Sequence, residues 1–346
     1  ALVHIWRSIA RFDRHNTGGF STFEQAIGNP YIPGAIETCC TIAWIALSLD
    51  VLKLTGDSTV ADELEWSTWN TVLGAQHPSG RWWTYDTPMD GERKASAHSI
   101  VFQARAGTPE LNCCSVNGPR GLGMISEWAF LTDAQGVFVN YYGPLEADLE
   151  TQGHGRIRLR EETDYPAANR VVVQVTPGAP TAMTLRFRIP GWSKHTKAWI
   201  NGEPVSGVDP GTYLALAREW RPGDRVELEF DFAIRPWVGD YNCSGKVSLF
   251  RGPLLLAFDP HFNAFDEDQI PALDAKRLSY SDVKPGKEKF PPLVLLEFQG
   301  HDDRPVRLCD FATAGAPGTA YRTWLPAIHF APPTPVLKGP ADGAAI

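Results

Sequence analysis

The chain has 346 residues and a formal net charge of −8, with 43% hydrophobic and 21% charged residues. This composition is typical of a soluble globular protein with room for about two or three domains. The negative charge, without a basic cluster to offset it, argues against a nucleic-acid partner. The sequence has no uninterrupted apolar run of about 18 residues, so it predicts no membrane-spanning segment.

The first residues, Ala1–Trp6, have the pattern of the interior of an amphipathic helix. They include no initiator Met, signal peptide or helix cap. We therefore expect the chain to be part of a longer protein, and targeting signals give no localisation. The sequence also leaves open whether identical chains associate.

The first 135 residues are predicted to be mainly helical. Apolar residues from Ile36 to Leu49 fall mostly on one helical face, and this helix is expected to end near Gly56. Ser58 is the predicted cap of a second helix, which runs towards Gly74. After a loop rich in Gly, Pro and Trp, a third helix is predicted over residues 119–131.

From about Gly136 the hydrophobic pattern changes to a period of two, which is typical of strands. Short turn-forming sequences such as Asn201-Gly202 separate the predicted strands. Such a series favours an antiparallel β-sandwich. The predicted strands are 137–142, 156–160, 171–175, 183–189, 197–200 and 225–230. We therefore expect a helical segment over 1–135, a β-sandwich over 136–260, and a further β-rich region with a Pro-rich extension over 261–346.

Four of the six cysteines form two adjacent pairs, Cys39-Cys40 and Cys113-Cys114. Neighbouring cysteines rarely form a disulfide with each other, because the ring is strained. Glu37 precedes Cys39 by two residues, and one carboxylate with three thiolates supplies four ligands, the usual number for zinc. The two pairs therefore favour a metal site, and simple buried cysteines are the alternative. The remaining two, Cys243 and Cys309, have no ligand pattern and are predicted to be isolated thiols.

An ordered set of motifs covers roughly residues 1–260. In the helical part they are Thr17-Gly18-Gly19, Glu24, Gly28-Asn29-Pro30-Tyr31, Glu37-Thr38-Cys39, residues 54–57 and 64–70, and Asn112-Cys113-Cys114. In the β-region they are residues 163–166, 185–192, 201–203, 218–224 and 251–253. This set resembles glycoside hydrolase family 127, the β-L-arabinofuranosidases.

The resemblance implies an (α/α)₆ barrel followed by β-sandwich domains. Too few helices are predicted here for a complete barrel. We therefore expect a multidomain α + β protein that contains the last helices of the barrel and antiparallel β-sandwich domains.

The resemblance also implies a mechanism in which a zinc-bound cysteine replaces the nucleophilic carboxylate of other retaining glycosidases. The matching position is Cys113, which would attack the anomeric carbon and form a thioglycosyl intermediate. Glu37, Cys39 and Cys114 would complete the zinc ligands. Cys40 matches no assigned role and is expected to be in the core or beside the ligands.

The acid/base implied by the resemblance is Glu24, although the spacing to Glu37 then requires a short deletion. Alignment on Gly28-Asn29-Pro30-Tyr31 instead places Gln25 at that position, and glutamine cannot transfer a proton as an acid/base must. His98, in the loop before the second cysteine pair, is a candidate substrate contact or a solvated loop residue.

Trp82, Trp83 and Tyr85 could line a sugar pocket or pack in an aromatic core. Taken together, the sequence predicts a zinc-dependent retaining glycoside hydrolase that acts on an L-arabinofuranoside or a related plant sugar. The alternative is a non-catalytic carbohydrate-binding or scaffold protein with a structural zinc or thiol cluster.

Overall fold

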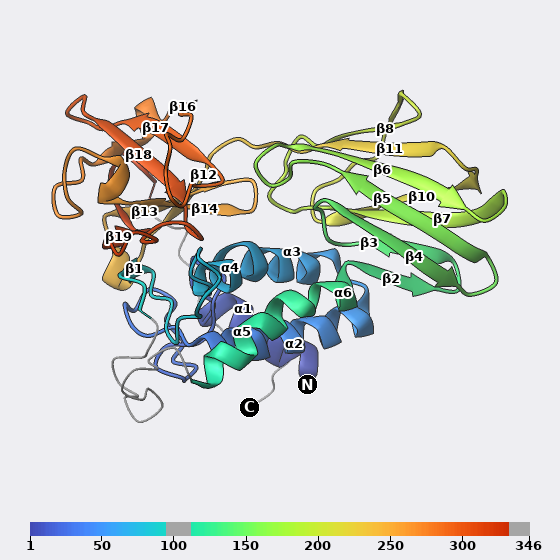
Figure 1. The fold of residues 1–346 in the computed structure, drawn as a ribbon, viewed down its shortest axis with the longest axis horizontal. Coiled ribbons are helices and arrows are strands. Elements are labelled where there is room, and N and C mark those ends of the chain that lie inside the picture. The colour runs from blue at the N-terminus through green and yellow to red at the C-terminus, as the bar shows by residue number, and fades with distance from the viewer. Residues whose placement is uncertain (95–111, 332–346) are drawn as a thin grey trace.

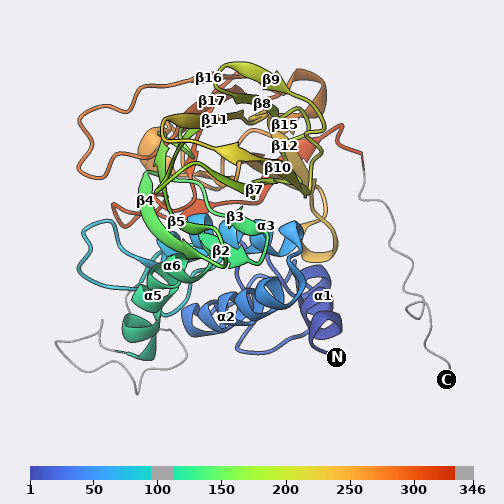
Figure 2. The same ribbon diagram turned by 90° about the vertical axis from the view of Figure 1, so that its right-hand side faces the viewer.

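The computed structural model describes residues 1–94 and 112–331. The helices form one layer, and two separate β units lie on it (Figure 1). The same arrangement is visible after a 90° rotation, with α1 and α2 at the bottom and the sheets above them (Figure 2). This confirms the predicted mixed fold of helices followed by many strands.

The helical layer is built around α2. Its elements are α1 (Leu2–Phe12), α2 (Thr38–Thr55), α3 (Ser58–Ser67), the π-helical turn η1 (Thr68–Val72), α4 (Leu73–Ala75), α5 (Cys113–Gly123) and α6 (Ile125–Trp128). α2 packs against α1, α3 and α5, and its Trp44 and Ile45 are buried in their shared core. Among the described helices, α2 alone is long and apolar enough to cross a bilayer, but packing in this core accounts for its apolar character.

Two predicted helix boundaries need correction. Gly56 ends α2 in the left-handed conformation, as expected, but Asp57 rather than Ser58 caps α3 and accepts a hydrogen bond from the Thr59 amide. The third helix begins at Cys113, not at Pro119, because Asn112 and Ser115 form a capping box at its start. The cysteine pair is therefore the first turn of α5 rather than the residues before it.

The first β unit is a sandwich of two sheets. One has the strand order β10-β7-β3-β2, and the other has β4-β5-β6-β11-β8-β9. The strands are β2 (Phe130–Asp133), β3 (Gly136–Val139), β4 (Leu145–Thr151), β5 (Gly155–Glu162), β6 (Arg170–Pro177), β7 (Thr181–Ile189), β8 (Lys197–Ile200), β9 (Glu203–Val205), β10 (Thr212–Trp220) and β11 (Asp224–Glu229). Within this sandwich, all strand pairs are antiparallel except β3 with β7. Phe130 and Leu131, expected to end a helix, are the first two residues of the strand β2.

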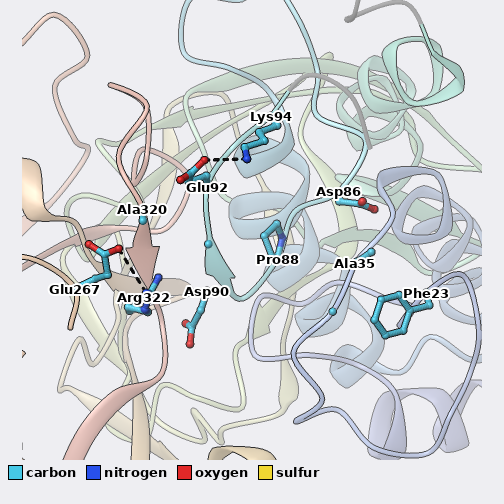
Figure 3. A pocket seen from close by; sticks show the side chains of 12 residues that line it. Phe23, Ala35, Asp86, Pro88, Asp90, Glu92, Lys94, Glu267, Ala320 and Arg322 are labelled. Atoms are coloured by element: carbon cyan, nitrogen blue, oxygen red, sulfur yellow. Dashed lines mark ion pairs between the residues drawn. The ribbon is translucent and has the colours of Figure 1, made fainter. Parts of the chain in front are cut away.

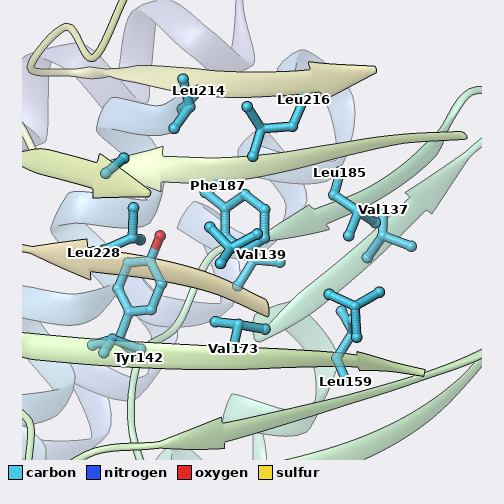
Figure 4. Packing of buried hydrophobic residues seen from close by; sticks show 14 of the residues in the cluster. Val137, Val139, Tyr142, Leu159, Val173, Leu185, Phe187, Leu214, Leu216 and Leu228 are labelled. Atoms are coloured by element: carbon cyan, nitrogen blue, oxygen red, sulfur yellow. The ribbon is translucent and has the colours of Figure 1, made fainter. Parts of the chain in front are cut away.

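The sandwich core follows from the alternation of apolar and polar residues along each strand. Val137, Phe187 and Leu214 come from one sheet, and Leu159 and Val173 come from the other; all five are buried in one cluster. Figure 4 shows these side chains directed into the space between the two sheets. The period of two in the sequence therefore correctly indicated which faces are buried.

The second β unit is a ten-stranded sheet with the central order β15-β20-β13-β14-β18-β17-β16. Its strands are β1 (Asp90–Gly91), β12 (Arg235–Val238), β13 (Lys246–Arg251), β14 (Leu254–Phe258), β15 (Leu273–Asp274), β16 (Tyr280–Asp282), β17 (Leu295–Gln299), β18 (Pro305–Asp310), β19 (Tyr321–Arg322) and β20 (Leu325–Ile328). Three 3₁₀ turns connect them: η3 (Tyr241–Cys243), η4 (Pro260–Phe262) and η5 (Ala275–Arg277). β1 comes from the loop between α4 and α5 and pairs with β19, so the helical segment contributes to this C-terminal sheet.

A buried ion-pair cluster, which we call the Arg188 junction, joins α3 to the sandwich. Arg188 lies 2.6 Å from Glu65 Oε1 and 2.6 Å from Asp62 Oδ1, and its own side chain is fully buried. The Tyr165 hydroxyl donates to Glu65 at 2.6 Å, and the Trp192 indole N–H donates to it at 3.1 Å. Burial would lower the pKa of Arg188, but the two carboxylates raise it well above its usual value. The guanidinium is therefore charged and fully paired.

Two asparagines join the helical layer to the C-terminal sheet. The Asn70 side chain donates to the Pro253 carbonyl at 2.9 Å and accepts from the Leu255 amide at 2.8 Å. Asn16 donates to Ser248 Oγ at 2.7 Å and to Thr323 Oγ1 at 2.8 Å. Because these polar contacts are buried, they fix the position of the C-terminal sheet on the helical layer.

The two cysteines of the β-region agree with the prediction of isolated thiols. Cys243 is buried and donates to the Tyr31 carbonyl at 3.4 Å. Cys309 is fully buried in the C-terminal sheet and donates to the Ala257 carbonyl at 3.6 Å. Both thiols are free and belong to the packing of their surroundings.

Candidate functional site

The N-terminal ends of α2 and α5 meet at a cluster of one carboxylate and three thiols, which we call the thiol cluster. Its members are Glu37, Cys39, Cys113 and Cys114, whose ligand atoms all lie within 4.8 Å of one another. Glu37 is the cap residue of α2, Cys39 is in its first turn, and the other two cysteines start α5. The positive ends of two helix dipoles therefore point at groups that can carry negative charge.

Close helix packing allows this meeting. A Cβ atom at Gly121 of α5 would lie 2.4 Å from Ile42 Cδ1 of α2, and one at Gly118 would lie 2.3 Å from the Trp83 ring. Only glycine permits these approaches. The small residues of α5 thus explain why its first turn reaches the first turn of α2.

The distances within the thiol cluster fit a tetrahedral metal site. The sulfurs of Cys39 and Cys114 are 3.2 Å apart, those of Cys113 and Cys114 are 4.0 Å apart, and Glu37 Oε1 is 3.9 Å from Cys114 Sγ. Two sulfurs bound at about 2.3 Å to one tetrahedral zinc lie roughly 3.8 Å apart. Small adjustments would therefore place all four donors around one ion, and the cluster could hold a metal.

The three sulfurs differ in exposure and in hydrogen bonding. Cys114 is buried, Cys39 is half-buried, and Cys113 is the most exposed of the three. The Cys114 thiol hydrogen-bonds Cys39, which lowers the pKa of Cys39 to about 7 and raises the pKa of Cys114. Asn117 also donates to Cys39 Sγ at 3.3 Å. Burial raises the pKa of Cys113.

Glu37 is oriented by the neighbouring cysteine. Its side chain makes no capping bond to the helix backbone, and its Oε2 accepts from the Cys40 thiol at 2.9 Å. Burial raises the pKa of Cys40 to about 12, with a further contribution from this bond, so Cys40 stays a protonated donor. Cys40 thus hydrogen-bonds the candidate ligand Glu37 and is not itself a member of the thiol cluster.

Glu24 lies at the tip of a tight turn near the thiol cluster. Thr22 and Gln25 pair through both backbone hydrogen bonds, and the two residues between them have positive φ, 49° at Phe23 and 62° at Glu24. A left-handed conformation at two successive non-glycine residues costs of order 1 kcal/mol each, and such strain is concentrated at functional sites.

Tyr85 connects this turn with the thiol cluster. Its hydroxyl donates to Glu24 Oε1 at 2.9 Å, and its ring packs in one cluster with Cys39 and Cys114. Burial raises the pKa of Tyr85 well above its usual value, so it remains a donor. Its carbonyl accepts from the Thr38 amide at 2.8 Å, which fixes Tyr85 to the start of α2.

The matches to family models decide the assignment. Residues 1–127 match the β-L-arabinofuranosidase GH127 catalytic domain, and residues 136–232 match the GH127 middle domain. Together these two ranges cover well over half of the chain. The chain belongs to glycoside hydrolase family 127.

Solved structures of GH127 proteins share the fold. A GH127 β-L-arabinofuranosidase from Geobacillus stearothermophilus T6 aligns with a TM-score of 0.79 and 22% identity, over 93% of this chain and 56% of that one. Another GH127 β-arabinofuranosidase aligns with a TM-score of 0.80 and 22% identity, over 93% and 55% of the two chains. A further glycoside hydrolase aligns with a TM-score of 0.78 and 22% identity, over 93% of this chain and 61% of that one.

The chain thus spans between 55 and 61% of the length of these GH127 and related structures. No curated protein matches the chain.

The four metal ligands expected for a GH127 protein therefore lie together, and the two acid/base candidates are placed differently. Both are exposed residues of the turn, and the Glu24 carboxylate contacts the Tyr85 hydroxyl. His98 lies outside the described residues. Of the aromatic candidates, Trp83 is a core residue and Trp82 stacks on His77. Tyr85 contacts a residue of the candidate site, Glu24.

Asp86 and Asn117 were not anticipated. Asp86 pairs through its backbone with Glu37, and burial, with the charges of Glu37 and Glu24, raises the pKa of its carboxyl to about 6. Asn117 lies four residues after Cys113 on α5, so a correct helix start would have placed it beside the cysteines. No local pattern marks Asp86, because only the folded chain brings it to Glu37.

Proposed function

We propose that the protein is a zinc-dependent retaining glycoside hydrolase that removes a β-L-arabinofuranosyl group from a plant-derived glycan, with Cys113 as nucleophile. The observation that supports this most directly is the thiol cluster of three sulfurs and one carboxylate at two helix ends. The GH127 catalytic-domain match supports a carbohydrate substrate of this class.

The donor set has the ligand types that zinc prefers. Glu37, Cys39, Cys113 and Cys114 would hold the ion, and they come from helix starts that already favour negative charge. When bound, zinc supplies positive charge that keeps the cluster sulfurs ionised at neutral pH. Within residues 1–94 and 112–331, no Lys, Arg or His forms an ion pair with Glu37, so a bound cation would provide the missing charge.

Cys113 fits the role of nucleophile because it is the most exposed sulfur of the cluster. Its thiolate attacks the anomeric carbon and forms a C–S bond while the glycosidic C–O bond breaks. Cys39 and Cys114, which are less exposed, serve as supporting ligands.

Glu24 fits the role of acid/base because its carboxyl is held by Tyr85 beside the thiol cluster. It donates a proton to the departing oxygen in the first step. In the second step it accepts a proton from water, which attacks the anomeric carbon and releases the Cys113 thiolate. Tyr85 fixes the carboxyl by donating to one of its oxygens.

The nucleophile is tested with p-nitrophenyl β-L-arabinofuranoside and the full chain loaded with zinc. Cys113→Ala is expected to lower kcat by at least a thousandfold, whereas Cys243→Ala, which removes a buried thiol elsewhere, should retain activity. Mass spectrometry of acid-quenched enzyme should find a pentosyl adduct on the peptide that contains Cys113. Hydrolysis by Cys113→Ala at the wild-type rate would disprove the assignment.

The acid/base is tested by comparing leaving groups. Glu24→Gln should slow a substrate with a poor leaving group at least a hundredfold and a nitrophenyl substrate much less, because the latter needs little protonation. Gln25→Ala is the matched control and should behave like the wild type. An unchanged rate of Glu24→Gln on the substrate with the poor leaving group would show that Glu24 is not the acid/base, and stoichiometric zinc without any hydrolysis would favour a non-catalytic zinc protein.

A further inference from the structure

A cavity of about 530 Å³ lies between the loop 86–94, the Phe23–Glu24 turn and the C-terminal sheet. Its lining includes Phe23, Asp86, Glu92, Lys94, Glu267 and Arg322 (Figure 3). The volume is within the range of about 300–1,000 Å³ found for small-molecule sites. The helical segment and the C-terminal sheet both contribute walls, so the cavity exists only in the assembled fold.

One end of this cavity adjoins the candidate active site. Asp86 lines the cavity, and its backbone pairs with that of Glu37. Phe23 also lines it and directly precedes Glu24 in the turn. In Figure 3 these two side chains lie on one side, and Glu267 and Arg322 lie on the other. Glu24 and the thiol cluster do not line the cavity themselves, so Phe23 and Asp86 are the residues that connect it with the candidate active site.

The cavity offers the contacts that sugars use. The Phe23 ring is 56% exposed, although large aromatic side chains are usually covered. Gly34 leaves room for the ring, since a Cβ there would lie 2.7 Å from Phe23 Cζ. A ring held in this way can stack on the apolar C–H face of a sugar.

The charged residues form pairs that can bind hydroxyl groups. Lys94 lies 3.0 Å from Glu92, and Arg322 lies 3.6 Å from Glu267. Asp86 adds a carboxylate without a described ion pair. Because acidic groups outnumber basic ones in the lining, an acidic sugar would be repelled and a neutral one favoured.

The walls are fixed before any ligand binds. Asp90 accepts from the Thr323 amide at 2.7 Å and the Trp324 amide at 3.1 Å, which ties the loop to the C-terminal sheet. Arg93, which is buried, donates to the carbonyls of Ala314 and Phe311. A cavity with fixed walls loses little entropy on binding.

We propose that this cavity is the leaving-group subsite, which binds the neutral sugar unit to which the arabinofuranosyl group is attached. This inference rests on the proposed function, because a sugar leaves the anomeric carbon only if the protein cleaves a glycosidic bond. Phe23 stacks on that sugar, and Asp86, Arg322 and Glu267 bind its hydroxyls. The C-terminal sheet thereby determines which glycans are accepted.

The test compares two substrates in full-length protein. One is p-nitrophenyl β-L-arabinofuranoside, and the other is a neutral arabinofuranose trisaccharide with a terminal β-L linkage. Phe23→Ala and Arg322→Ala should each reduce the ratio of kcat/KM for the trisaccharide to that for the aryl substrate at least tenfold. Arg277→Ala, an exposed residue of the same β unit that is paired with Asp303, is the control and should leave the ratio unchanged.

A calorimetric titration gives a readout that does not need catalysis. The neutral disaccharide left after removal of the terminal sugar should bind wild-type protein at least tenfold more tightly than Phe23→Ala or Arg322→Ala. A galacturonic acid disaccharide should bind at least tenfold more weakly than the neutral one.

The two measurements fail in different ways. Absence of aryl hydrolysis in the wild type contradicts the proposed function, while the titration still decides the subsite. No disaccharide binding, or equal affinity in wild type and both variants, overturns the subsite even if the aryl substrate is hydrolysed.

Discussion

The thiol cluster and the Arg188 junction both gather charged or ionisable side chains from distant parts of the chain, but they differ in balance. At the junction, Arg188 faces Glu65 and Asp62, and further donors complete the hydrogen bonding of both carboxylates. The thiol cluster has four groups that become negative and, among the described residues, no ion-paired cation. The junction is complete as a structural element, whereas the thiol cluster is a group of four donors that could hold a metal ion.

The largest effect is expected from breaking the junction. Arg188→Met leaves the buried Glu65 and the partly buried Asp62 without a counter-charge, and breaking such a buried pair typically costs about 3–5 kcal/mol in the free energy of unfolding. Urea denaturation followed by tryptophan fluorescence measures this loss. Arg158→Ala, which breaks an exposed ion pair on the sandwich surface, is the control and should leave the unfolding midpoint nearly unchanged.

A second substitution sharpens the result. Adding Glu65→Gln to Arg188→Met removes one uncompensated buried charge and should restore part of the lost free energy of unfolding. If the double variant is instead as unstable as the sum of the two single variants, the loss does not arise from uncompensated charge.

A somewhat smaller effect is expected at His15, which fixes the loop that carries Glu24. Its Nδ1 lies 2.7 Å from the Pro30 carbonyl and its Nε2 lies 2.9 Å from Thr22 Oγ1. Burial lowers the pKa of His15 from 6.5 to about 4. As pH falls below 6.5, His15 takes up a proton in the unfolded chain but stays neutral in the folded protein until the pH is near 4. This linkage reduces stability by about 3 kcal/mol between pH 7 and pH 4 and has no effect above pH 7.

The measurement is the difference in unfolding free energy between wild type and His15→Gln across this range. Glutamine keeps one donor and one acceptor but does not titrate. The difference removes the effect of other buried groups, such as Asp62, whose pKa burial raises to about 6. As pH falls, the unfolding free energy of the variant should increase relative to that of the wild type. Parallel curves of unfolding free energy against pH would contradict the prediction.

The smallest of the three effects is expected from metal removal. A ligand that binds only the folded state stabilises it by about 2.7 kcal/mol at a free concentration of 100 times its Kd. Dialysis against a chelator should therefore lower the Tm, and added zinc should restore it. Cys114→Ala should lose this response, and Cys243→Ala should keep it. An unchanged Tm after complete chelation would mean that the thiol cluster resembles the junction and needs no cation.

The sequence predicted the features that depend on local chemistry. Gly56 indicated the end of α2, and the strand periodicity indicated the sandwich core. The ligand set was predicted because two cysteine pairs and a nearby carboxylate are unusual. The prediction of Ser58 as cap is wrong because Asp57, one position earlier, is an equally good capping residue.

Other features were beyond local reasoning because they join distant residues. The Tyr85–Glu24 contact connects positions 61 residues apart, and the Arg188–Glu65 pair connects positions 123 apart. The start of α5 was missed for a different reason. Pro119 is typical of a helix start, but Asn112 and Ser115 already carry the capping signal upstream of it.

The contacts of Asn16 have a consequence for any shortened version of this chain. The GH127 matches end at residue 232, which suggests that the remaining residues could be deleted. Asn16, however, directly precedes Thr17 and follows His15 in the loop leading to Glu24, and its two side-chain partners are Ser248 and Thr323. Deletion of the residues after the sandwich would remove Ser248 and Thr323. The loop that leads to Glu24 would then lose these two hydrogen bonds to the C-terminal sheet. A truncation intended to retain the active site should therefore keep every residue through β20.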